Sequence, residues 1–187
     1  MAALYEKIVV VTRQTELDEL VQRFNTPAQA RFYLEQGGHA FEAIQSAHDR
    51  YRHIVTAVVE SLGSQQKVQV IDRSIVPQFT FADDDLVVTI GQDGLVSNTA
   101  KYLQGQPMFA INPDPERYDG VLLPFQPTDF AGNLAAAIRG EMNSAEVTLA
   151  RARSSNGQEL LAFNDFFIGA RSHVSARYEI AVGGHTE

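Results

Sequence analysis

The chain has 187 residues, 44% of them hydrophobic, which is enough for a globular domain with a buried core. Its 15 Lys and Arg against 23 Asp and Glu give a net charge of -8, so we expect no nucleic acid partner. Because there is no cysteine, disulfides, thiolate nucleophiles and cysteine zinc sites are excluded, and we expect a cytoplasmic protein.

The N-terminal residues 1–12 carry acidic and basic side chains before a short apolar run. This pattern predicts a first strand and not a signal peptide. The β-branched residues 8–11 are typical of a strand that is covered on both faces. No apolar run approaches the roughly 20 residues that span a bilayer, so we expect no membrane partner.

Helices are predicted after this strand. Thr15 followed three residues later by Asp18 resembles a capping box, and residues 26–27, Thr-Pro, are typical of the start of a second helix. The two glycines at 37–38 should end that helix. Apolar side chains then recur at spacings of three and four over residues 39–62, which predicts a long amphipathic helix.

Strands and helices alternate in the next part of the chain. Strands are predicted at residues 68–71, 86–90 and 107–111. A helix capped by Thr128 should follow and end at Gly140. Strands separated by long helices need crossover connections, so residues 1–142 are predicted to form an α/β nucleotide-binding domain with a mostly parallel, doubly wound sheet.

The apolar pattern changes to a period of two after Asn143. Asn156-Gly157 predicts a tight hairpin turn, and strands are expected at residues 160–168 and 174–182. Residues 143–187 should therefore form an antiparallel β domain. A domain with so few strands has open sheet edges and little core. We therefore expect this domain to be incomplete and the chain to be a fragment. We also expect the protein to be a homo-oligomer, because an assembly would cover the open edges.

The stretch Gly91-Gln92-Asp93-Gly94 lies between a predicted strand and a predicted helix. In open α/β sheets ligands bind beyond the carboxyl ends of the strands, and glycine loops there present backbone N–H groups to phosphates. Asp93 would repel a phosphate directly, but it could accept a proton from an attacking hydroxyl or hold Mg²⁺. The alternative is that Asp93 caps the helix and the glycines make the turn.

Two motifs resemble those of the NAD kinase family, whose relatives include diacylglycerol kinases and phosphofructokinases. The strand and Gly91–Gly94 loop resemble the family's GGDG loop. Asn164-Asp165, within Phe-Asn-Asp-Phe-Phe-Ile, resembles the Asn-Glu/Asp motif that holds the dinucleotide. Asn and Asp are also poor strand residues, which points to a bulge, a ligand contact or a plain loop at this position.

The resemblance implies transfer of a phosphoryl group from ATP or polyphosphate to the 2'-hydroxyl of NAD, assisted by Mg²⁺, with small-molecule nucleotides as the partners. Asp93 would contact or deprotonate that hydroxyl. The cofactor-binding residues would be Gly91, Gln92, Gly94, Asn112, Asn164 and Asp165. Positioning and neutralisation of charge supply most of the catalysis in such reactions.

This chain departs from the family pattern at Gln92, where a glycine is usual, and at Leu95, where a threonine is usual. The family's threonine- and glycine-rich nucleotide loop has no counterpart before Glu187. Two alternatives therefore stay open. The chain is a diverged sugar or lipid kinase of the same superfamily, or it is a binding module that holds a nucleotide without turning it over.

Other polar residues have a purely structural interpretation as well as a functional one. Asn112 or Asp114 could face the cleft, but the prolines around them also define an ordinary loop. The aspartates at 83–85 should point alternately to opposite faces and form no metal cluster. His48 and His53 are spaced wrongly for a metal pair and are interpreted as surface residues. Arg171 is a further candidate for a phosphate contact.

Overall fold

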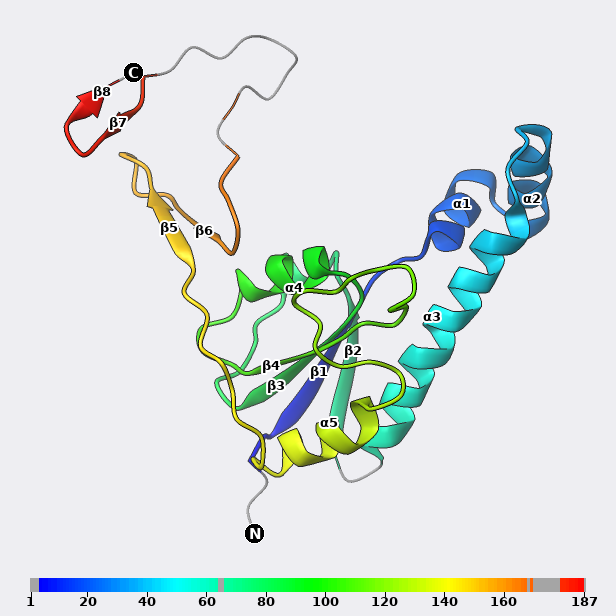
Figure 1. Cartoon of the computed structure of the whole chain (residues 1–187), viewed down its shortest axis with the longest axis horizontal. Helices are drawn as coiled ribbons and strands as arrows, with labels where there is room; N and C mark the ends of the chain where they lie inside the picture. The colour runs from blue at the N-terminus through cyan, green and yellow to red at the C-terminus, as the bar shows by residue number, and fades with distance from the viewer. Residues whose placement is uncertain (1–3, 64–65, 168, 170–178, 187) are drawn as a thin grey trace. The chain divides into compact units, whose positions relative to one another are not determined.

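The computed structural model describes residues 4–63, 66–167, 169 and 179–186, and it divides the chain into two compact units, residues 1–148 and 149–187. The division falls shortly after the predicted boundary at residue 142. The first unit contains four strands and five helices of the described part, and Figure 1 traces them in chain order. Its elements are β1 (Lys7–Thr12), α1 (Glu16–Phe24), α2 (Pro27–Gln36), α3 (Phe41–Leu62), β2 (Lys67–Asp72), a short 3₁₀ turn (Val76–Gln78), β3 (Asp85–Ile90), α4 (Asp93–Ala100), β4 (Met108–Ile111) and α5 (Phe130–Ile138).

The four strands form one parallel sheet in the order β2-β1-β3-β4. The predicted α/β class is therefore confirmed, and the sheet of the first unit is wholly parallel in the described residues. The central strands are covered on both faces: Ile8 to Val11 are fully buried, as are Val87 and Val88. This explains why both strands have continuous apolar sequences.

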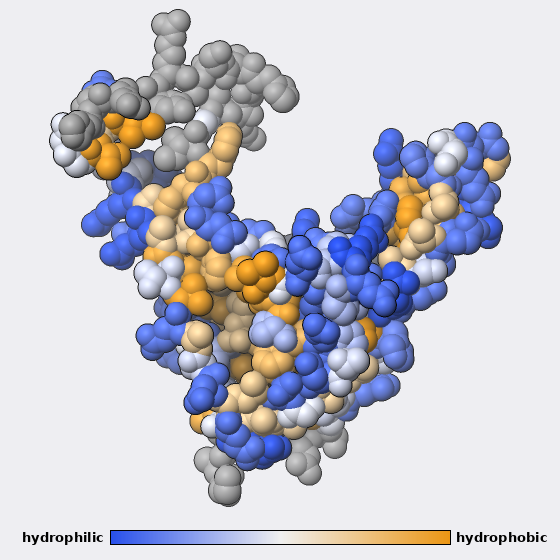
Figure 2. Space-filling view, viewed as in Figure 1, coloured by the Kyte–Doolittle hydropathy of each residue, from blue (hydrophilic) through white to orange (hydrophobic). Residues whose placement is uncertain are grey.

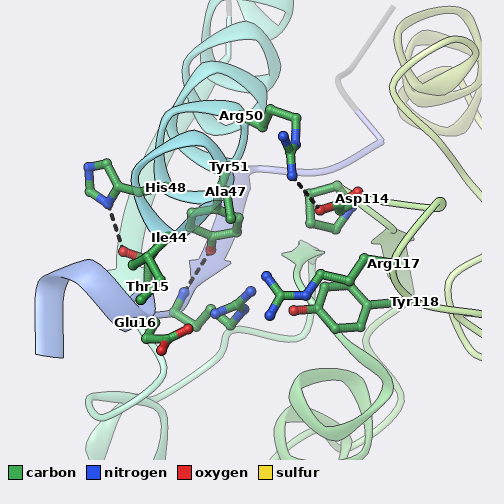
Figure 3. A pocket seen from close by; sticks show the side chains of 12 residues that line it. Thr15, Glu16, Ile44, Ala47, His48, Arg50, Tyr51, Asp114, Arg117 and Tyr118 are labelled. Atoms are coloured by element: carbon green, nitrogen blue, oxygen red, sulfur yellow. Dashed lines mark hydrogen bonds and ion pairs between the residues drawn. The ribbon is translucent and has the colours of Figure 1, made fainter. Parts of the chain in front are cut away.

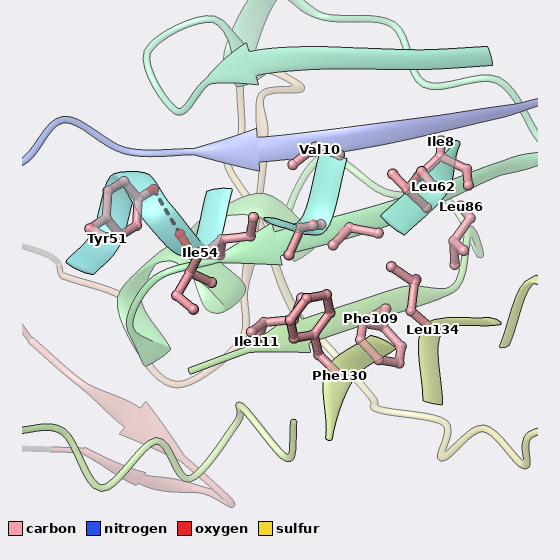
Figure 4. Close-up of a cluster of buried hydrophobic side chains, with 13 residues drawn as sticks. Ile8, Val10, Tyr51, Ile54, Leu62, Leu86, Phe109, Ile111, Phe130 and Leu134 are labelled. Atoms are coloured by element: carbon pink, nitrogen blue, oxygen red, sulfur yellow. Dashed lines mark hydrogen bonds between the residues drawn. The ribbon is translucent and has the colours of Figure 1, made fainter. Parts of the chain in front are cut away.

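Helices cover both faces of this sheet. Side chains from α3 and α5 pack on the face that carries Val10 and Val88, and Figure 4 shows this cluster around Ile54, Phe109 and Leu134. The opposite face carries Val9 and packs against Leu95 of α4. The alternation follows from the strand itself, because successive side chains point to opposite faces of a sheet.

The helix ends follow the sequence signals closely. Thr15 caps α1 in a reciprocal capping box with Asp18, and Thr26 caps α2 with Pro27 at the first helical position. The N-cap of α5 is Asp129 and not the predicted Thr128, and no side chain caps that helix. Instead the Asp129 carboxylate accepts a hydrogen bond from the backbone of Gln126, so it closes the turn before the helix.

The helices α1 and α2 pack on the N-terminal part of α3 through Leu17, Ala30 and Phe41. Figure 2 shows hydrophilic residues over most of the outer surface of this helical arm, with hydrophobic residues gathered in a strip along it. This is the distribution expected of amphipathic helices. Within the described residues, no helix combines the length and the apolar character needed to cross a bilayer.

The second unit contains two small antiparallel sheets among its described residues. The first is the predicted hairpin, formed by β5 (Ala150–Arg153) and β6 (Glu159–Ala162), and Gly157 in its turn has φ of +85°. The second pairs β7 (Ala181–Val182) with β8 (His185–Thr186).

The predicted strand 160–168 is shorter in the structure, because β6 ends at Ala162 and residues 163–167 have irregular backbone. This stretch contains the poor strand formers Asn164 and Asp165, so the backbone leaves the hairpin before them. Most of the predicted strand 174–182 lies outside the described residues, as do Arg171 and its predicted phosphate contact.

Candidate functional site

The connections that leave β1 and β3 run toward opposite edges of the sheet. From β1 the chain passes through α3 to β2 on one side, and from β3 it passes through α4 to β4 on the other side. The connecting helices lie on opposite faces of the sheet. Beyond the carboxyl ends of two such neighbouring strands, a parallel sheet leaves room for ligands. The residues that follow β1 and β3 are therefore the first place to look for a site.

Gly91 follows β3 at this edge, and its backbone N–H donates to the Ile111 carbonyl at 3.2 Å. A Cβ atom placed on Gly91 would stand 2.8 Å from Cδ2 of Leu95 and 3.6 Å from Cδ of Arg13. The residue is therefore glycine because of crowding, since its φ is not positive. Gly94 differs: the same test finds no atom within 4 Å, so its missing side chain leaves open space at the start of α4.

Asp93 is the first residue of α4, and Gln92 is the N-cap without a capping side chain. The carboxylate of Asp93 accepts a hydrogen bond of 2.6 Å from the backbone N–H of Leu122, which lies in the loop between β4 and α5. The side chain of Asp93 therefore binds this loop and does not cap its own helix. No described residue forms a hydrogen bond to its second oxygen, Oδ2.

Asn112 follows β4 and is buried, with 1% of its surface exposed. Its amide Nδ2 donates to the Tyr118 carbonyl at 2.8 Å, and its Oδ1 accepts from the Asp114 backbone at 3.1 Å. Gly120, with φ of +63°, fits against this amide. Asn112 therefore shapes the β4–α5 loop from inside, and its predicted contact with a cofactor stays a prediction.

Asn164 and Asp165 belong to the second unit, where both are exposed. The backbone at these positions is neither strand nor helix, so the motif lies in a loop and not in a strand bulge, and its contact with a ligand stays a prediction. That they meet Asp93 across a cleft stays a prediction.

A pocket opens beside the end of β1, between α3 and the β4–α5 loop (Figure 3). The hydroxyl of Tyr51, on α3, anchors its wall: it accepts from the Arg13 backbone N–H at 2.8 Å and donates to the Ile90 carbonyl at 3.0 Å. Burial raises the pKa of the Tyr51 phenol, which keeps the hydroxyl protonated and able to donate. One side chain thus fixes the ends of both central strands relative to α3.

The second wall of the pocket contains Thr15 and His48. The ring Nδ1 of His48 lies 2.7 Å from Oγ1 of Thr15, and the same hydroxyl takes part in the capping box with Asp18. Burial alone would raise the pKa of Asp18, but hydrogen bonds from Thr15 and Arg52 outweigh burial, and the pKa is lowered. His48 is half-buried, with 19% of its side chain exposed, whereas His53 is exposed as predicted.

Sequence reasoning did not predict this pocket, and four of the residues that it missed are Arg13, His48, Tyr51 and Arg117. Arg13 carried a signal, because it directly follows the first strand at the edge where ligands bind. The other three come from a helix and a loop whose approach to β1 depends on tertiary packing. Asp114, one of the weighed candidates, does line this pocket, where it pairs with Arg50 at 3.3 Å.

The described residues contain no group of three or more His, Asp or Glu side chains that could hold a metal ion, so the metal implied by the resemblance has no site formed by protein ligands alone. Mg²⁺ in phosphoryl-transfer sites is held by one or two carboxylates together with waters and substrate phosphates. Asp93 has a carboxylate oxygen to offer in that manner. Its placement therefore fits a substrate-bound Mg²⁺ and not a metal held by protein alone.

The fold and the edge residues together describe an open α/β protein with polar groups beyond the carboxyl ends of its strands. Compared with known proteins, the chain matches no family model and no curated sequence.

Proposed function

We propose that this protein is a NAD kinase-like phosphotransferase that moves a phosphoryl group from ATP or polyphosphate to the 2'-hydroxyl of NAD. One observation carries the proposal. The Gly91–Gly94 loop, with its single carboxylate Asp93, follows β3 at the point where the connections from β1 and β3 diverge. Substrate phosphates bind at such points in open α/β sheets.

The local geometry supports separate roles for Gly94 and Asp93 in the loop. Gly94 leaves open space at the start of α4, where backbone N–H groups point outward and favour an anion. Asp93 is held by Leu122 through one oxygen, so its second oxygen has a fixed direction. In the proposed reaction that oxygen orients the acceptor hydroxyl and takes its proton, or contacts the Mg²⁺ that neutralises the phosphates.

Asn164 and Asp165 complete the proposal as residues that bind the ribose and base of NAD. Both side chains are exposed and therefore accessible to a ligand. Gln92, half-buried at the N-cap of α4, and Leu95 depart from the family pattern, so a sugar or a lipid head group stays open as the acceptor.

A nucleotide-binding module without turnover is the second candidate. It is favoured by the hydrogen bond from Leu122, because this contact gives the Asp93 carboxylate a structural role whether or not chemistry occurs.

Self-association remains part of both proposals. The outer edge of β2 pairs with no other strand of the described residues, and sedimentation would detect an assembly that covers it.

The deciding experiment measures NADP formation from NAD with ATP or polyphosphate and Mg²⁺, together with NAD binding by calorimetry. Asp93→Asn keeps an oxygen for Leu122 but removes the charge, so we expect NADP formation to fall by roughly a hundredfold or more while NAD binding is kept. Asp119→Asn, an exposed carboxylate in the same β4–α5 loop, is the matched control and should leave the rate unchanged.

With a sugar and a diacylglycerol assayed as further acceptors, four outcomes have different meanings. NADP formation that depends on Asp93 supports the kinase. Binding of NAD without product in any arm supports the binding module, and a product formed only with a sugar or a diacylglycerol supports the diverged kinase. If the protein neither binds NAD nor phosphorylates any of these acceptors, the proposed function is rejected.

A further inference from the structure

The pocket beside β1 contains three arginines contributed by separate segments of an acidic chain. Arg13 follows β1, Arg50 lies on α3, and Arg117 lies in the β4–α5 loop. The cavity holds about 60 Å³, whereas about 10–15 Å³ is enough for one water. It is therefore large enough for a small charged group and too small for a whole nucleotide.

The three guanidinium groups differ in how they are paired. Arg50 has a carboxylate partner, Asp114, at 3.3 Å. Arg117 forms no ion pair within the described residues, and its guanidinium lies over the Tyr118 ring at 5.5 Å. Arg13 also forms no ion pair there; its Nη1 donates only to the neighbouring Gln14 carbonyl. Two positive charges are thus left without carboxylate partners in a chain whose net charge is -8.

The Nε of Arg13 adds an independent observation. This atom is buried, and no described residue accepts its proton. Buried donors in native proteins are nearly always paired with protein, water or a ligand. The stem of Arg13 runs past Gly91, and its guanidinium lies near the Tyr51 ring, at 5.0 Å from the ring centroid. The side chain is therefore held in place while its buried Nε–H has no acceptor among the described residues.

Other groups around the cavity fit the same ligand. Figure 3 shows the Arg117 guanidinium and the Tyr118 hydroxyl pointing from the β4–α5 loop toward Thr15 and Glu16. Glu16 is the second carboxylate of the lining, and it is exposed. The lining thus contains three arginines and two carboxylates, Glu16 and Asp114. Its net charge is positive even when His48 is neutral, and this favours an anion.

We propose that Arg13 and Arg117 bind an oxyanion, a phosphate or carboxylate group of a small ligand, in the pocket between the end of β1 and the β4–α5 loop. The planar fork of a guanidinium matches the paired oxygens of both groups, and a charge-assisted hydrogen bond would satisfy Arg13 Nε. This inference does not depend on the proposed kinase activity, because it rests on a pocket that contains neither Asp93 nor the Asn164-Asp165 pair.

The test is titration of the whole protein with inorganic phosphate and, separately, with acetate, at constant ionic strength because surface attraction is screened by salt. Binding is followed by calorimetry and by the thermal midpoint. We expect saturable binding of at least one anion in the millimolar range or tighter, weakened about tenfold or more in Arg117→Gln and in Arg13→Gln. Tighter binding of phosphate would assign a phosphate group, and tighter binding of acetate a carboxylate group.

Arg23→Gln is the matched control. Arg23 is an exposed arginine stacked over the ring of the next residue, Phe24, at 5.3 Å, just as Arg117 is stacked over Tyr118, but it lies outside the pocket. It should bind the anion as the wild type does. If Arg13→Gln fails to fold, Arg117→Gln decides, because that side chain is exposed.

The proposal is overturned if the wild type binds neither anion, or if Arg117→Gln binds as tightly as the wild type. Asp93→Asn separates the two proposals: it should strongly reduce NADP formation and leave the binding of the free anion unchanged. Loss of the kinase reaction therefore does not count against the oxyanion pocket, and a pocket that binds neither phosphate nor acetate does not count against the kinase.

Discussion

The carboxylate of Asp93 accepts a hydrogen bond from the backbone N–H of Leu122 at a distance of 2.6 Å. This contact joins the first residue of α4 to the loop that follows β4. The residue at the centre of the proposed chemistry is therefore also a structural tether. Variants of Asp93 must be interpreted with both roles in mind.

Replacement of Asp93 should separate these roles. Asp93→Ala leaves the half-buried Leu122 N–H without an acceptor, and we expect a loss of about 1–3 kcal/mol in the free energy of unfolding. Asp93→Asn keeps an acceptor oxygen and should lose clearly less. Urea unfolding of both variants measures the difference, and equal losses would show that the contact with Leu122 contributes little.

The two glycines of the loop should respond differently to alanine. Gly91→Ala places a methyl group 2.8 Å from the buried Leu95 side chain, and crowding of this kind typically costs about 1–3 kcal/mol. Gly94→Ala meets no atom within 4 Å and lies within α4, where alanine is favoured over glycine by up to about 1 kcal/mol. Thermal unfolding should therefore rank Gly94→Ala at or above the wild type and Gly91→Ala below it.

Gly120, the one glycine of the β4–α5 loop, should be difficult to replace. Its φ is +63°, and a Cβ atom would stand 2.5 Å from the amide Nδ2 of the buried Asn112. Backbone strain and steric overlap should together cost more than the roughly 1–2 kcal/mol of a left-handed alanine alone. Gly38→Ala is the control, because Gly38 has φ of +75° and open space around it. Similar losses in the two variants would contradict the packing of Gly120 on Asn112.

The stability of the protein should fall in acid partly through Asp18. Its pKa is lowered in the folded state by hydrogen bonds that overcome the effect of burial. As the pH falls, the unfolded chain binds the proton first, near pH 4, and the stabilisation from Asp18 is lost as the pH approaches the lower folded pKa. Asp18→Asn should therefore show a shallower decrease in unfolding free energy between about pH 5 and pH 2.

Arg52 provides a second test of this origin. Its guanidinium donates to Asp18 at 2.8 Å, so Arg52→Gln should remove part of the same acid dependence. The result would be seen in urea unfolding at a series of pH values. A pH dependence that is identical in the wild type, Asp18→Asn and Arg52→Gln would place the acid sensitivity elsewhere.

Much of the first unit could be predicted because its signals are local. The capping box of Thr15 and Asp18 and the Thr26-Pro27 helix start depend on residues within one turn. The strands were recognisable because buried strands of a parallel sheet are apolar on both faces. The hairpin at Gly157 was likewise set by its turn residues.

The failures occurred where neighbouring signals compete or where a partner is needed. Thr128 and Asp129 are both good capping residues, and the choice depended on the turn that Asp129 closes with Gln126. The strand predicted to reach residue 168 ends at Ala162, opposite Ala150 at the end of its partner strand. A strand persists only while a neighbour pairs with it, and the sequence of one strand does not state the length of the other.

By itself the sequence determined the fold class, most of the helix ends and the place of the Gly91–Gly94 loop, since each depends on residues close together in the chain. Only the tertiary structure decided that Asp93 meets Leu122, that His48 meets Thr15 and that Arg13 and Arg117 line one pocket. The physical reason is that these contacts join segments brought together by the burial of α3 and α5 on the sheet. Apolar periodicity predicts that such burial happens, but it does not predict which polar side chains meet at the edge.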